Sequence, residues 1–204
     1  MAKTLASQAK NGGSIPLARS SPALPYPSPP LSDALVALRP WRPEDVEAGL
    51  MLFADPLVQR FSWPQSRAYT VEDARAYLAA QAEGRLRGEQ VELAVTEAGD
   101  PDAVLGGAAL YDLDRAHARA SVGYWLAAHG RGRGVATRAV RLLAAWAFGP
   151  LELARLELTC APDNLASQRV AERCGFVREG LLRSHMAFKG GRRDTVVYGL
   201  LPPG

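Results

Sequence analysis

An α+β fold, in which helices cover both faces of a mixed sheet, is the architecture that the order of patterns along this chain indicates. Three strand-like runs follow one another between residues 89 and 127, separated only by short turn-forming segments, which is typical of antiparallel strands. After them, helical and strand-like patterns alternate, which indicates a mixed sheet. A chain of 204 residues can bury one good hydrophobic core, so we expect one domain.

Residues 1–33 are predicted to be a disordered tail or a leader, and residues 34–204 are predicted to be the folded domain. The first segment holds six of the fifteen prolines and many serines, and no acidic residue precedes Asp33. A segment of this composition buries too little apolar surface to offset the entropy of ordering it.

Three patterned segments open the predicted domain. Residues 34–41 read as a strand, and residues 42–56 read as a short helix with acidic residues in its first turn, where the helix dipole favours them. Residues 70–86 form a clearer helix, because Thr70 and Asp73 have the spacing of a capping box. The stretch between the two helices is expected to be a loop.

The remaining elements follow from the spacing of apolar residues, which recur every two residues in a strand and about every 3.6 residues in a helix. The expected strands are residues 89–97, 103–113, 118–127, 154–161, 176–188 and 194–201, and the expected helices are residues 134–148 and 165–174. Cys160, Cys174, Trp41, Trp146 and Phe176 are expected to be core or near-core residues.

Charge and cysteine content exclude several classes of protein. Without Lys3, Lys10 and Arg19, the 24 basic residues fall to 21 and balance the 21 acidic ones, so nucleic-acid binding is not expected. The two cysteines are too few for a disulfide scaffold, and no apolar run approaches the roughly 18 residues of a membrane span. We expect a cytoplasmic protein without a membrane partner, and the spacing of histidines and cysteines predicts no metal site.

The segment GRGRGVAT, residues 130–137, joins a predicted strand to a predicted helix. A Rossmann fingerprint would need glycine where Val135 or Thr137 stands, and a Walker loop would need a Gly-Lys pair that this segment lacks. An arginine-glycine tract for RNA is disfavoured because such tracts lie in disordered segments, whereas this one continues into an apolar helix.

An anion site at the start of that helix remains. Gly132 and Gly134 let backbone N–H groups approach an oxygen-rich ligand, and the helix dipole adds partial positive charge. Arg131 and Arg133 would neutralise the remaining charge of a pyrophosphate. These residues alone also leave open a purely structural alternative, in which the segment is a tight turn that binds no ligand and its arginines lie in solvent.

Two longer motifs give this loop a family context. The segment RGRGVA (131–136) follows the pattern Arg/Gln-x-x-Gly-x-Gly/Ala, and NLASQRVAERCGFVREGLLR (164–183) lies about thirty residues further on. Together they resemble the GNAT superfamily of N-acetyltransferases, specifically its RimJ/RimL-like branch, over residues 34–201. Further similar segments are VQRFSWP (58–64), LGGAALYDLD (105–114), VGYWL (122–126) and GGRRDTVVYGLL (190–201).

The resemblance implies a GNAT fold with acetyl-CoA as cosubstrate. The sheet would have six to seven mostly antiparallel strands, with two parallel central strands, 121–127 and 155–161, that splay apart around acetyl-CoA. Backbone groups of Trp125, Leu126 and Ala127 would pair with the pantetheine arm. The pyrophosphate would be held by the N–H groups of Arg131, Gly132, Arg133, Gly134, Val135, Ala136 and Thr137.

The resemblance also implies two catalytic residues for direct attack of an amine on the thioester. Asn164 and Ser167 match the Asn-x-x-Ser of the family, so Asn164 would bind pantetheine or a water and Ser167 would help to protonate the thiolate. Many relatives instead have a tyrosine where Ala171 stands. The residues alone also fit a simpler role, because either side chain could cap the helix N-terminus.

The general base is the point at which the sequence departs from the family. Relatives often carry glutamate at the position of Ser121, and serine does not act as a base at neutral pH. Arg138 likewise replaces a common glutamate and would either aid phosphate binding or face solvent. The candidates for the base, besides a water chain, are Asp112, Asp114, His117 and Glu92.

The acceptor is expected to be a primary amine, either a protein N-terminus or a small molecule. Trp63, Asp112 and Ser121 are the predicted acceptor-binding residues, and Asp194 and Tyr198 resemble positions near the active-site face. We expect a monomer or a homodimer. The missing glutamate keeps an alternative open, a non-catalytic GNAT module that binds acyl-CoA as a sensor or an interaction subunit.

Overall fold

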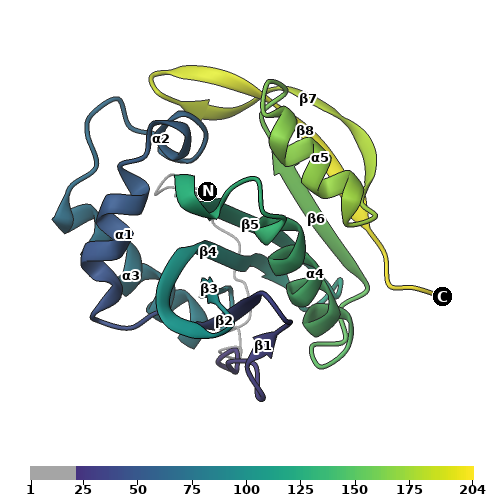
Figure 1. Ribbon diagram of the computed structural model, residues 1–204. Helices are drawn as coiled ribbons and strands as arrows, with labels where there is room; N and C mark the ends of the chain where they lie inside the picture. Colours follow the sequence, from purple (N-terminus) through teal and green to yellow (C-terminus); the bar gives the residue numbers. More distant parts are fainter. Residues whose placement is uncertain (1–21) are drawn as a thin grey trace, which may run out of the picture.

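A computed structural model describes residues 22–204, which form an eight-stranded sheet with helices on both faces (Figure 1). The strands are β1 (Leu31–Ser32), β2 (Val36–Pro40), β3 (Val91–Glu97), β4 (Asp100–Asp114), β5 (Arg119–Leu126), β6 (Arg155–Cys160), β7 (Val177–Phe188) and β8 (Gly191–Leu200). The helices are α1 (Asp45–Phe53), α2 (Pro56–Ser62), α3 (Val71–Leu86), α4 (Val135–Phe148) and α5 (Leu165–Arg173), with a 3-10 turn η1 (Ala128–Gly130).

The sheet confirms the predicted fold class. Its order is β1-β2-β3-β4-β5-β6-β8-β7, and every neighbouring pair is antiparallel except β5 and β6. The two-residue strand β1 brings the number of strands above the expected six to seven. Among residues 22–204, no helix is both long and apolar enough to cross a membrane.

The chain packs before residue 34. Leu24 is 1% exposed, and its N–H donates to the carbonyl of Arg85 at 3.0 Å. β1 then pairs with β2 at the edge of the sheet. The packed fold therefore extends into the segment that we expected to be a tail, because Leu24 supplies apolar surface to the core. The part of that prediction that concerns residues 1–21 lies outside the described residues.

The helices begin where local capping chemistry allows. The predicted capping box at Thr70 and Asp73 is present at the start of α3. α2 occupies the stretch that we expected to be a loop: the carboxylate of Asp55 accepts from the N–H groups of Leu57 and Val58, and Pro56 stands in the first turn. Asp55 followed by Pro56 is a local helix-start signal, although the sequence analysis predicts a loop at this position.

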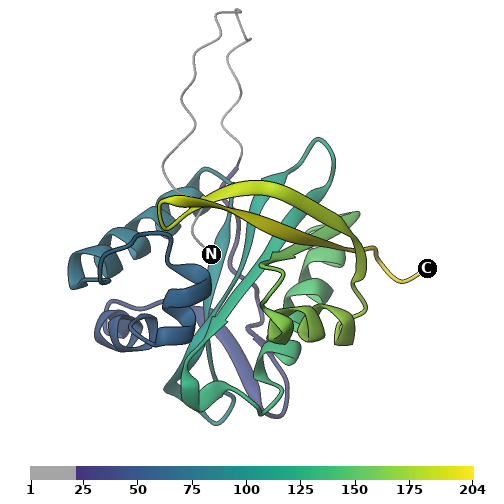
Figure 2. The same cartoon turned by 90° about the horizontal axis from the view of Figure 1, so that it is seen from above.

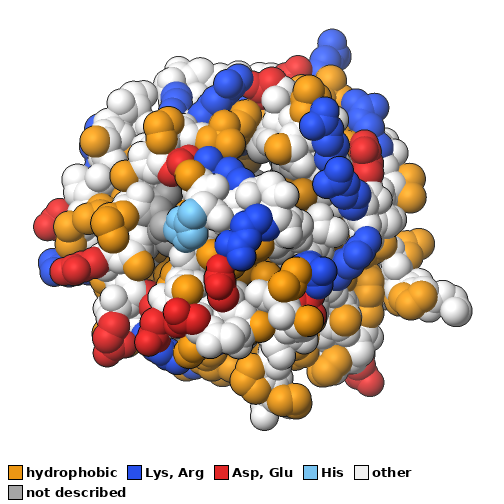
Figure 3. Space-filling model, viewed as in Figure 1, with side chains coloured by type: hydrophobic (Ala, Val, Ile, Leu, Met, Phe, Trp, Pro, Cys, Tyr) orange, Lys and Arg blue, Asp and Glu red, His pale blue; other side chains and the backbone are white. Residues whose placement is uncertain are grey.

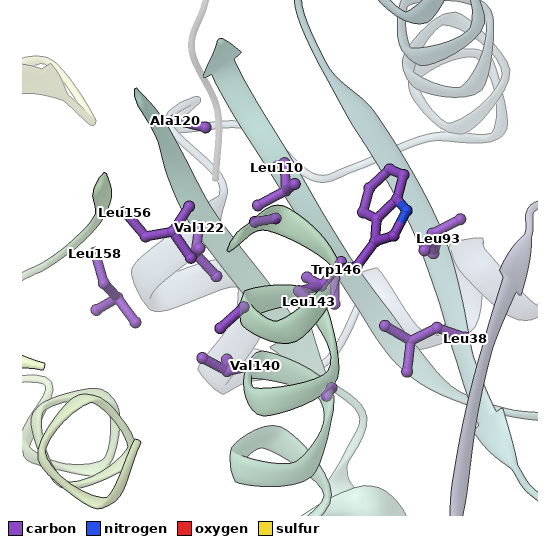
Figure 4. Packing of buried hydrophobic residues seen from close by; sticks show 14 of the residues in the cluster. Leu38, Leu93, Leu110, Ala120, Val122, Val140, Leu143, Trp146, Leu156 and Leu158 are labelled. Atoms are coloured by element: carbon purple, nitrogen blue, oxygen red, sulfur yellow. The ribbon is translucent and has the colours of Figure 1, made fainter. Parts of the chain in front are cut away.

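The core lies between α4 and the sheet. Figure 4 shows Val140, Leu143 and Trp146 of α4 against strand residues such as Leu93 and Leu110. Trp146 and Phe176 are buried, as expected. Trp41 is half-buried and stacks on Trp125, with ring centroids 5.9 Å apart.

Two parallel strands part in the middle of the sheet. β5 and β6 pair from Arg119 opposite Arg155 to Val122 opposite Leu158, and β5 continues to Leu126 without further pairing to β6. This confirms the predicted splay. Unpaired strand edges leave backbone groups for a ligand to satisfy.

The hairpin of β7 and β8 arches over the splayed strands toward α2 (Figures 1 and 2). Two hydrogen bonds join it to the end of α2. The N–H of Lys189 donates to the carbonyl of Pro64 at 2.8 Å, and the guanidinium of Arg193 donates to the carbonyl of Phe61 at 3.2 Å. The hairpin therefore covers one side of the gap between β5 and β6.

Candidate active site

Two cavities meet at the gap between β5 and β6. The first, of about 380 Å³, lies between α2, the N-terminus of α4 and α5, and we call it the α4-side cavity. The second, of about 520 Å³, lies under the β7–β8 hairpin, and we call it the hairpin-side cavity. Both are lined by Phe61, Ser62, Tyr124, Asn164 and Ser167. These five residues form the boundary that the two cavities share.

The α4-side cavity is built around an open helix end. Gly132 and Gly134 have φ of 74° and 78°, a backbone conformation that favours glycine. Gly134 is the N-cap of α4 and offers no side-chain hydrogen bond to the first turn. The N–H groups of Val135, Ala136 and Thr137 precede the first i to i−4 bond of the helix, which Arg138 makes to Gly134. This end of α4 therefore fits an anion.

The arginine side chains of the loop are engaged within the protein. Arg131 donates to the carboxylate of Asp55 at 2.5 and 3.2 Å and to the carbonyl of Leu126 at 2.7 Å. Arg133 pairs with Glu97 at 2.9 Å. The sequence predicted that both guanidiniums neutralise a bound anion. In the structure, each guanidinium pairs with a carboxylate from a distant part of the chain, so the backbone N–H groups are the part of this loop that stays open to an anion.

The backbone of the splayed strand offers fewer groups than predicted. The N–H of Ala127 donates to the carbonyl of Leu105 at 2.9 Å, and the carbonyl of Leu126 accepts from Arg131. Trp125 and Leu126 line the α4-side cavity, as do all the predicted loop residues except Arg133, whereas Ala127 does not.

Two further arginines line the α4-side cavity and were missed in the sequence. Arg169 and Arg173 lie one turn apart on α5, and both reach the cavity wall. Basic side chains gather over the α5 side of the face drawn in Figure 3. Arg138 of α4 is not part of this group, because it pairs with Asp33 at 2.7 Å.

At the junction of the cavities, Ser167 is held by two hydrogen bonds, one to its side chain and one from its backbone. Tyr124 Oη donates to Ser167 Oγ at 3.0 Å, and the N–H of Ser167 donates to Asn164 Oδ1 at 3.1 Å. Burial raises the pKa of Tyr124, so the phenol stays protonated. Ser167 is buried. Tyr124 lies in the VGYWL motif and had no assigned role; only the structure shows that it meets Ser167.

Asn164 caps α5, as the simpler sequence interpretation proposed. It also lines both cavities, so capping and ligand contact are compatible. Because the cap fixes the first turn of α5, it fixes the place of Ser167.

A row of polar residues crosses the floor of the hairpin-side cavity. Tyr111 lies opposite Ser121, and Ser121 lies opposite Glu157 on the neighbouring parallel strand. All three line the cavity. The carboxylate that is missing at Ser121 is therefore present one strand away, at Glu157, which sequence reasoning missed because only strand register brings the two residues together.

Asp112 lies at the rim of this cavity in a β-bulge. Between Tyr111 and Asp114, two residues of β4 oppose one of β5, and Asp112 has φ of 51°. The bulge turns Asp112 to the surface, and it lines the hairpin-side cavity. Asp112 and Ser121 thus line the same cavity, and their predicted role in binding the acceptor stays a prediction.

The other base candidates are less well placed. Asp114 lines the hairpin-side cavity, but it contacts His117 Nδ1 at 2.9 Å, and this hydrogen bond lowers its pKa. His117 does not line either cavity and is exposed.

Glu92 is buried behind Trp125 and lines neither of these cavities. Tyr77 donates a short hydrogen bond to it, and the indole of Trp125 donates at 3.3 Å. Burial raises the pKa of Glu92 to about 7, and these hydrogen bonds lower it in part. Glu92 therefore supports Tyr77 and Trp125 from outside the two cavities.

Three residues that were predicted near the acceptor lie elsewhere. Trp63 stacks edge-on against Tyr69 and donates to the carbonyl of Arg67, so Phe61 and Ser62 line the cavity in its place. Asp194 accepts from the N–H of Ser184 at 2.7 Å and holds a bulge of β7. Tyr198 is buried beneath α5.

Comparison with known proteins agrees with this geometry. A family model described as an acetyltransferase (GNAT) domain matches residues 36–177. The Bacillus subtilis protein named "Probable N-acetyltransferase YjcK" is 32% identical over 85% of this chain and 97% of its own length.

Solved structures extend the likeness. A protein described as a probable acetyltransferase of the GNAT family from Chromobacterium violaceum is 28% identical, with a TM-score of 0.76 over 96% of this chain and 97% of its own. RimL, described as a ribosomal alpha-N-protein acetyltransferase in complex with coenzyme A, is 21% identical, with a TM-score of 0.74 over 84% of this chain and 97% of its own. The likeness to RimL shows the fold alone.

Proposed function

Because the chain belongs to the GNAT family of acetyltransferases, we propose that it moves an acetyl group from acetyl-CoA to a primary amine. The α4-side cavity holds acetyl-CoA and the hairpin-side cavity holds the acceptor. The observation that carries this proposal is that the two cavities share one wall, where Tyr124 donates to Ser167.

The residues of the α4-side cavity fit acetyl-CoA. The open N-terminus of α4 suits a pyrophosphate, and Arg169 and Arg173 suit a further phosphate. When bound, acetyl-CoA supplies an acetyl group activated as a thioester. RimL, whose fold this chain shares, is described as a complex with coenzyme A.

Ser167 holds the proton that the departing sulfur needs. Because Tyr124 donates to Ser167 Oγ, that oxygen is already an acceptor, and the Ser167 O–H, which faces the Cys160 thiol, can turn toward the sulfur of a bound thioester. Tyr124 keeps its own proton because burial raises its pKa. The pair is therefore arranged as a general acid, with Tyr124 able to restore the proton of Ser167.

On the acceptor side, the amine must lose a proton before it attacks. Asp112 and Glu157 place carboxylates on the wall of the hairpin-side cavity and would attract an ammonium group. The proton then leaves through water toward this exposed rim, without a single buried base.

We propose a protein N-terminus as acceptor, by analogy with the RimL fold neighbour. Because Cys160 and Cys174 are free thiols, we place the reaction in the cytoplasm.

The test is a calorimetric titration with acetyl-CoA and with its dephospho analogue, followed by an assay of thiol release on a panel of peptides and small amines. We expect saturable binding, weaker binding of the dephospho analogue and turnover of at least one amine. Binding without turnover of any amine would contradict the enzymatic proposal and favour a sensor module. No binding would remove the assignment of the α4-side cavity.

A further inference from the structure

Arg193 is an arginine without a carboxylate partner on the wall of the hairpin-side cavity. Its Nη1 donates to the carbonyl of Phe61 at 3.2 Å, Nη2 lies 3.1 Å from Met186 Sδ, and its guanidinium stacks 3.9 Å from the ring centre of Phe188. Its buried Nε has no hydrogen-bond partner, and no salt bridge to Arg193 is present among residues 22–204. A desolvated guanidinium is costly unless an anion pairs with it.

Thr195 adds a second unpartnered polar group on the same face of β8. Residues two apart on a strand point to the same side of the sheet, and both Arg193 and Thr195 line the hairpin-side cavity. Thr195 is 2% exposed, and its hydroxyl has no partner within the described chain. Buried hydroxyls are nearly always hydrogen-bonded in folded proteins, so this group indicates a ligand.

Arg193 and Thr195 line the same cavity as Ser167. Cys160 also lines this cavity, and on the sheet it lies opposite Val196, the residue after Thr195. Burial raises the pKa of its thiol, and a hydrogen bond from Ser167 and the positive charge of Arg193 lower it in part. Burial also lowers the pKa of Arg193, and the negative charge of Asp163, which itself pairs with Arg60 at 2.7 Å, raises it in part.

We propose that Arg193 and Thr195 form a subsite for a carboxylate of the acceptor, so that the enzyme prefers amines that carry an acidic group close to the amine. This inference rests on the proposed function for the place of the amine. The guanidinium and the hydroxyl of Thr195 would donate to the carboxylate, while Ser167 faces the reacting end.

The wall of the cavity thus carries charges of both signs. Asp112 would draw the ammonium of the acceptor, beside Glu157, which also pairs with Arg155 at 3.0 Å and with Arg119 at 3.8 Å, and Arg193 under the hairpin would draw its carboxylate. A purely structural role for Arg193 would need only its bond to Phe61 and its stacking on Phe188. Neither contact explains why Nε and the hydroxyl of Thr195 lack partners.

The experiment uses pairs of acceptors that differ only in charge, assayed with the full-length protein. One pair is the peptides Ala-Glu-Ala-amide and Ala-Gln-Ala-amide, and the other is β-alanine and β-alaninamide. The first pair represents a protein N-terminus and the second a small amino acid. For whichever pair is turned over, we expect kcat/KM of the acidic member to exceed that of the neutral one about tenfold or more, mainly through KM.

Variants assign this preference to the subsite. In Arg193→Met the preference should fall below about threefold, Arg193→Lys should restore part of it, and Thr195→Val should reduce it. Arg192→Met is the matched control, since Arg192 is the neighbouring arginine of β8, is exposed and does not itself line the cavity; its guanidinium donates to the carbonyls of Ser184 and His185. It removes the same charge and should keep the preference. Thermal melting checks that each variant folds.

Equal kcat/KM within each pair, or a preference that persists in Arg193→Met, would overturn the subsite. Should no amine be turned over, the proposed function fails, and the subsite is decided by titrating the same four compounds into the protein with coenzyme A present. Tighter binding of the acidic members that is lost in Arg193→Met supports the subsite, and equal binding rejects it.

Discussion

α4 and α5 both begin at the gap between β5 and β6, but their first turns are completed in opposite ways. α4 starts at Gly134, which has a left-handed conformation and no side chain to cap the helix. α5 starts at Asn164, whose side chain accepts from the N–H of Ser167. One helix thus leaves its first N–H groups for a ligand, and the other satisfies them from its own sequence.

This difference separates two uses of a helix N-terminus. An open end, where the N–H groups and the dipole combine, binds an anion through the backbone. At a capped end, a side chain already accepts from one of these N–H groups. The N-terminus of α5 therefore serves to hold the side chain of Ser167 in place. Substitutions at the α4 end should therefore change cosubstrate affinity, whereas those at the α5 end should change turnover or stability.

The largest effect is expected from Gly134→Glu. No atom lies within 4 Å of a Cβ built at Gly134, so the side chain has room, although its φ of 78° makes the backbone strained by about 1 kcal/mol. The carboxylate would occupy the open end of α4 and repel a phosphate. We expect the dissociation constant of acetyl-CoA to rise about a hundredfold or more, as measured by calorimetry.

Gly134→Gln is the matched control, because it brings the same bulk and the same backbone strain without the charge. It should weaken binding clearly less than Gly134→Glu does. If both variants bound acetyl-CoA as tightly as the unmodified protein, the end of α4 would not be the phosphate site.

At the α5 end, Ser167→Ala is expected to act on the chemical step. It removes the proton donor but leaves Asn164 able to accept from the backbone N–H, so α5 keeps its cap. We expect kcat to fall about ten- to a hundredfold with little change in acetyl-CoA affinity. Steady-state kinetics measures the change in kcat, and calorimetry measures the change in acetyl-CoA affinity.

Tyr124→Phe is the companion change. It removes the donor to Ser167 Oγ but keeps the serine hydroxyl, so the loss in kcat should be smaller than in Ser167→Ala. Unchanged turnover in Ser167→Ala would mean that another group protonates the thiolate.

The local parts of this site could be predicted from the sequence. Glycine spacing before an apolar helix located the α4 end, and Asn164 with Ser167 located the α5 end, because capping and helix starts depend on residues three or four apart. The fold class followed from the order of the strands. The overlooked start of α2 at Asp55 and Pro56 was also a local signal.

The rest depends on contacts between distant segments. The partner of Arg131 is Asp55, which lies 76 residues earlier. The guanidinium that the sequence predicts to bind a phosphate is therefore paired within the protein. Glu157 reaches Ser121 only through the register of two parallel strands. Arg193 reaches the hairpin-side cavity because the hairpin folds over toward Phe61. No spacing along the chain encodes these three contacts.

A smaller effect is expected when the cap of α5 is removed. Asn164→Ala deletes the acceptor for the N–H of Ser167 and should lower the free energy of unfolding by about 1 kcal/mol. Urea denaturation measures this change. Asn164→Asp keeps an oxygen at the same place and should retain most of the stability. Equal losses in both variants would indicate that Asn164 acts through contacts other than the cap.

The smallest effect is expected from Arg133→Gln, at the α4 end. Arg133 follows Gly132 directly, yet its guanidinium pairs with Glu97 at 2.9 Å and lies outside the α4-side cavity. Its loss should change the dissociation constant of acetyl-CoA by less than about threefold at physiological salt, since exposed charges are strongly screened. Calorimetric titration of Arg133→Gln and Gly134→Glu with acetyl-CoA under the same conditions gives the comparison directly. A loss as large as that of Gly134→Glu would mean that arginine side chains rather than backbone N–H groups neutralise the phosphates, and the contrast between the open and the capped helix would no longer explain the binding.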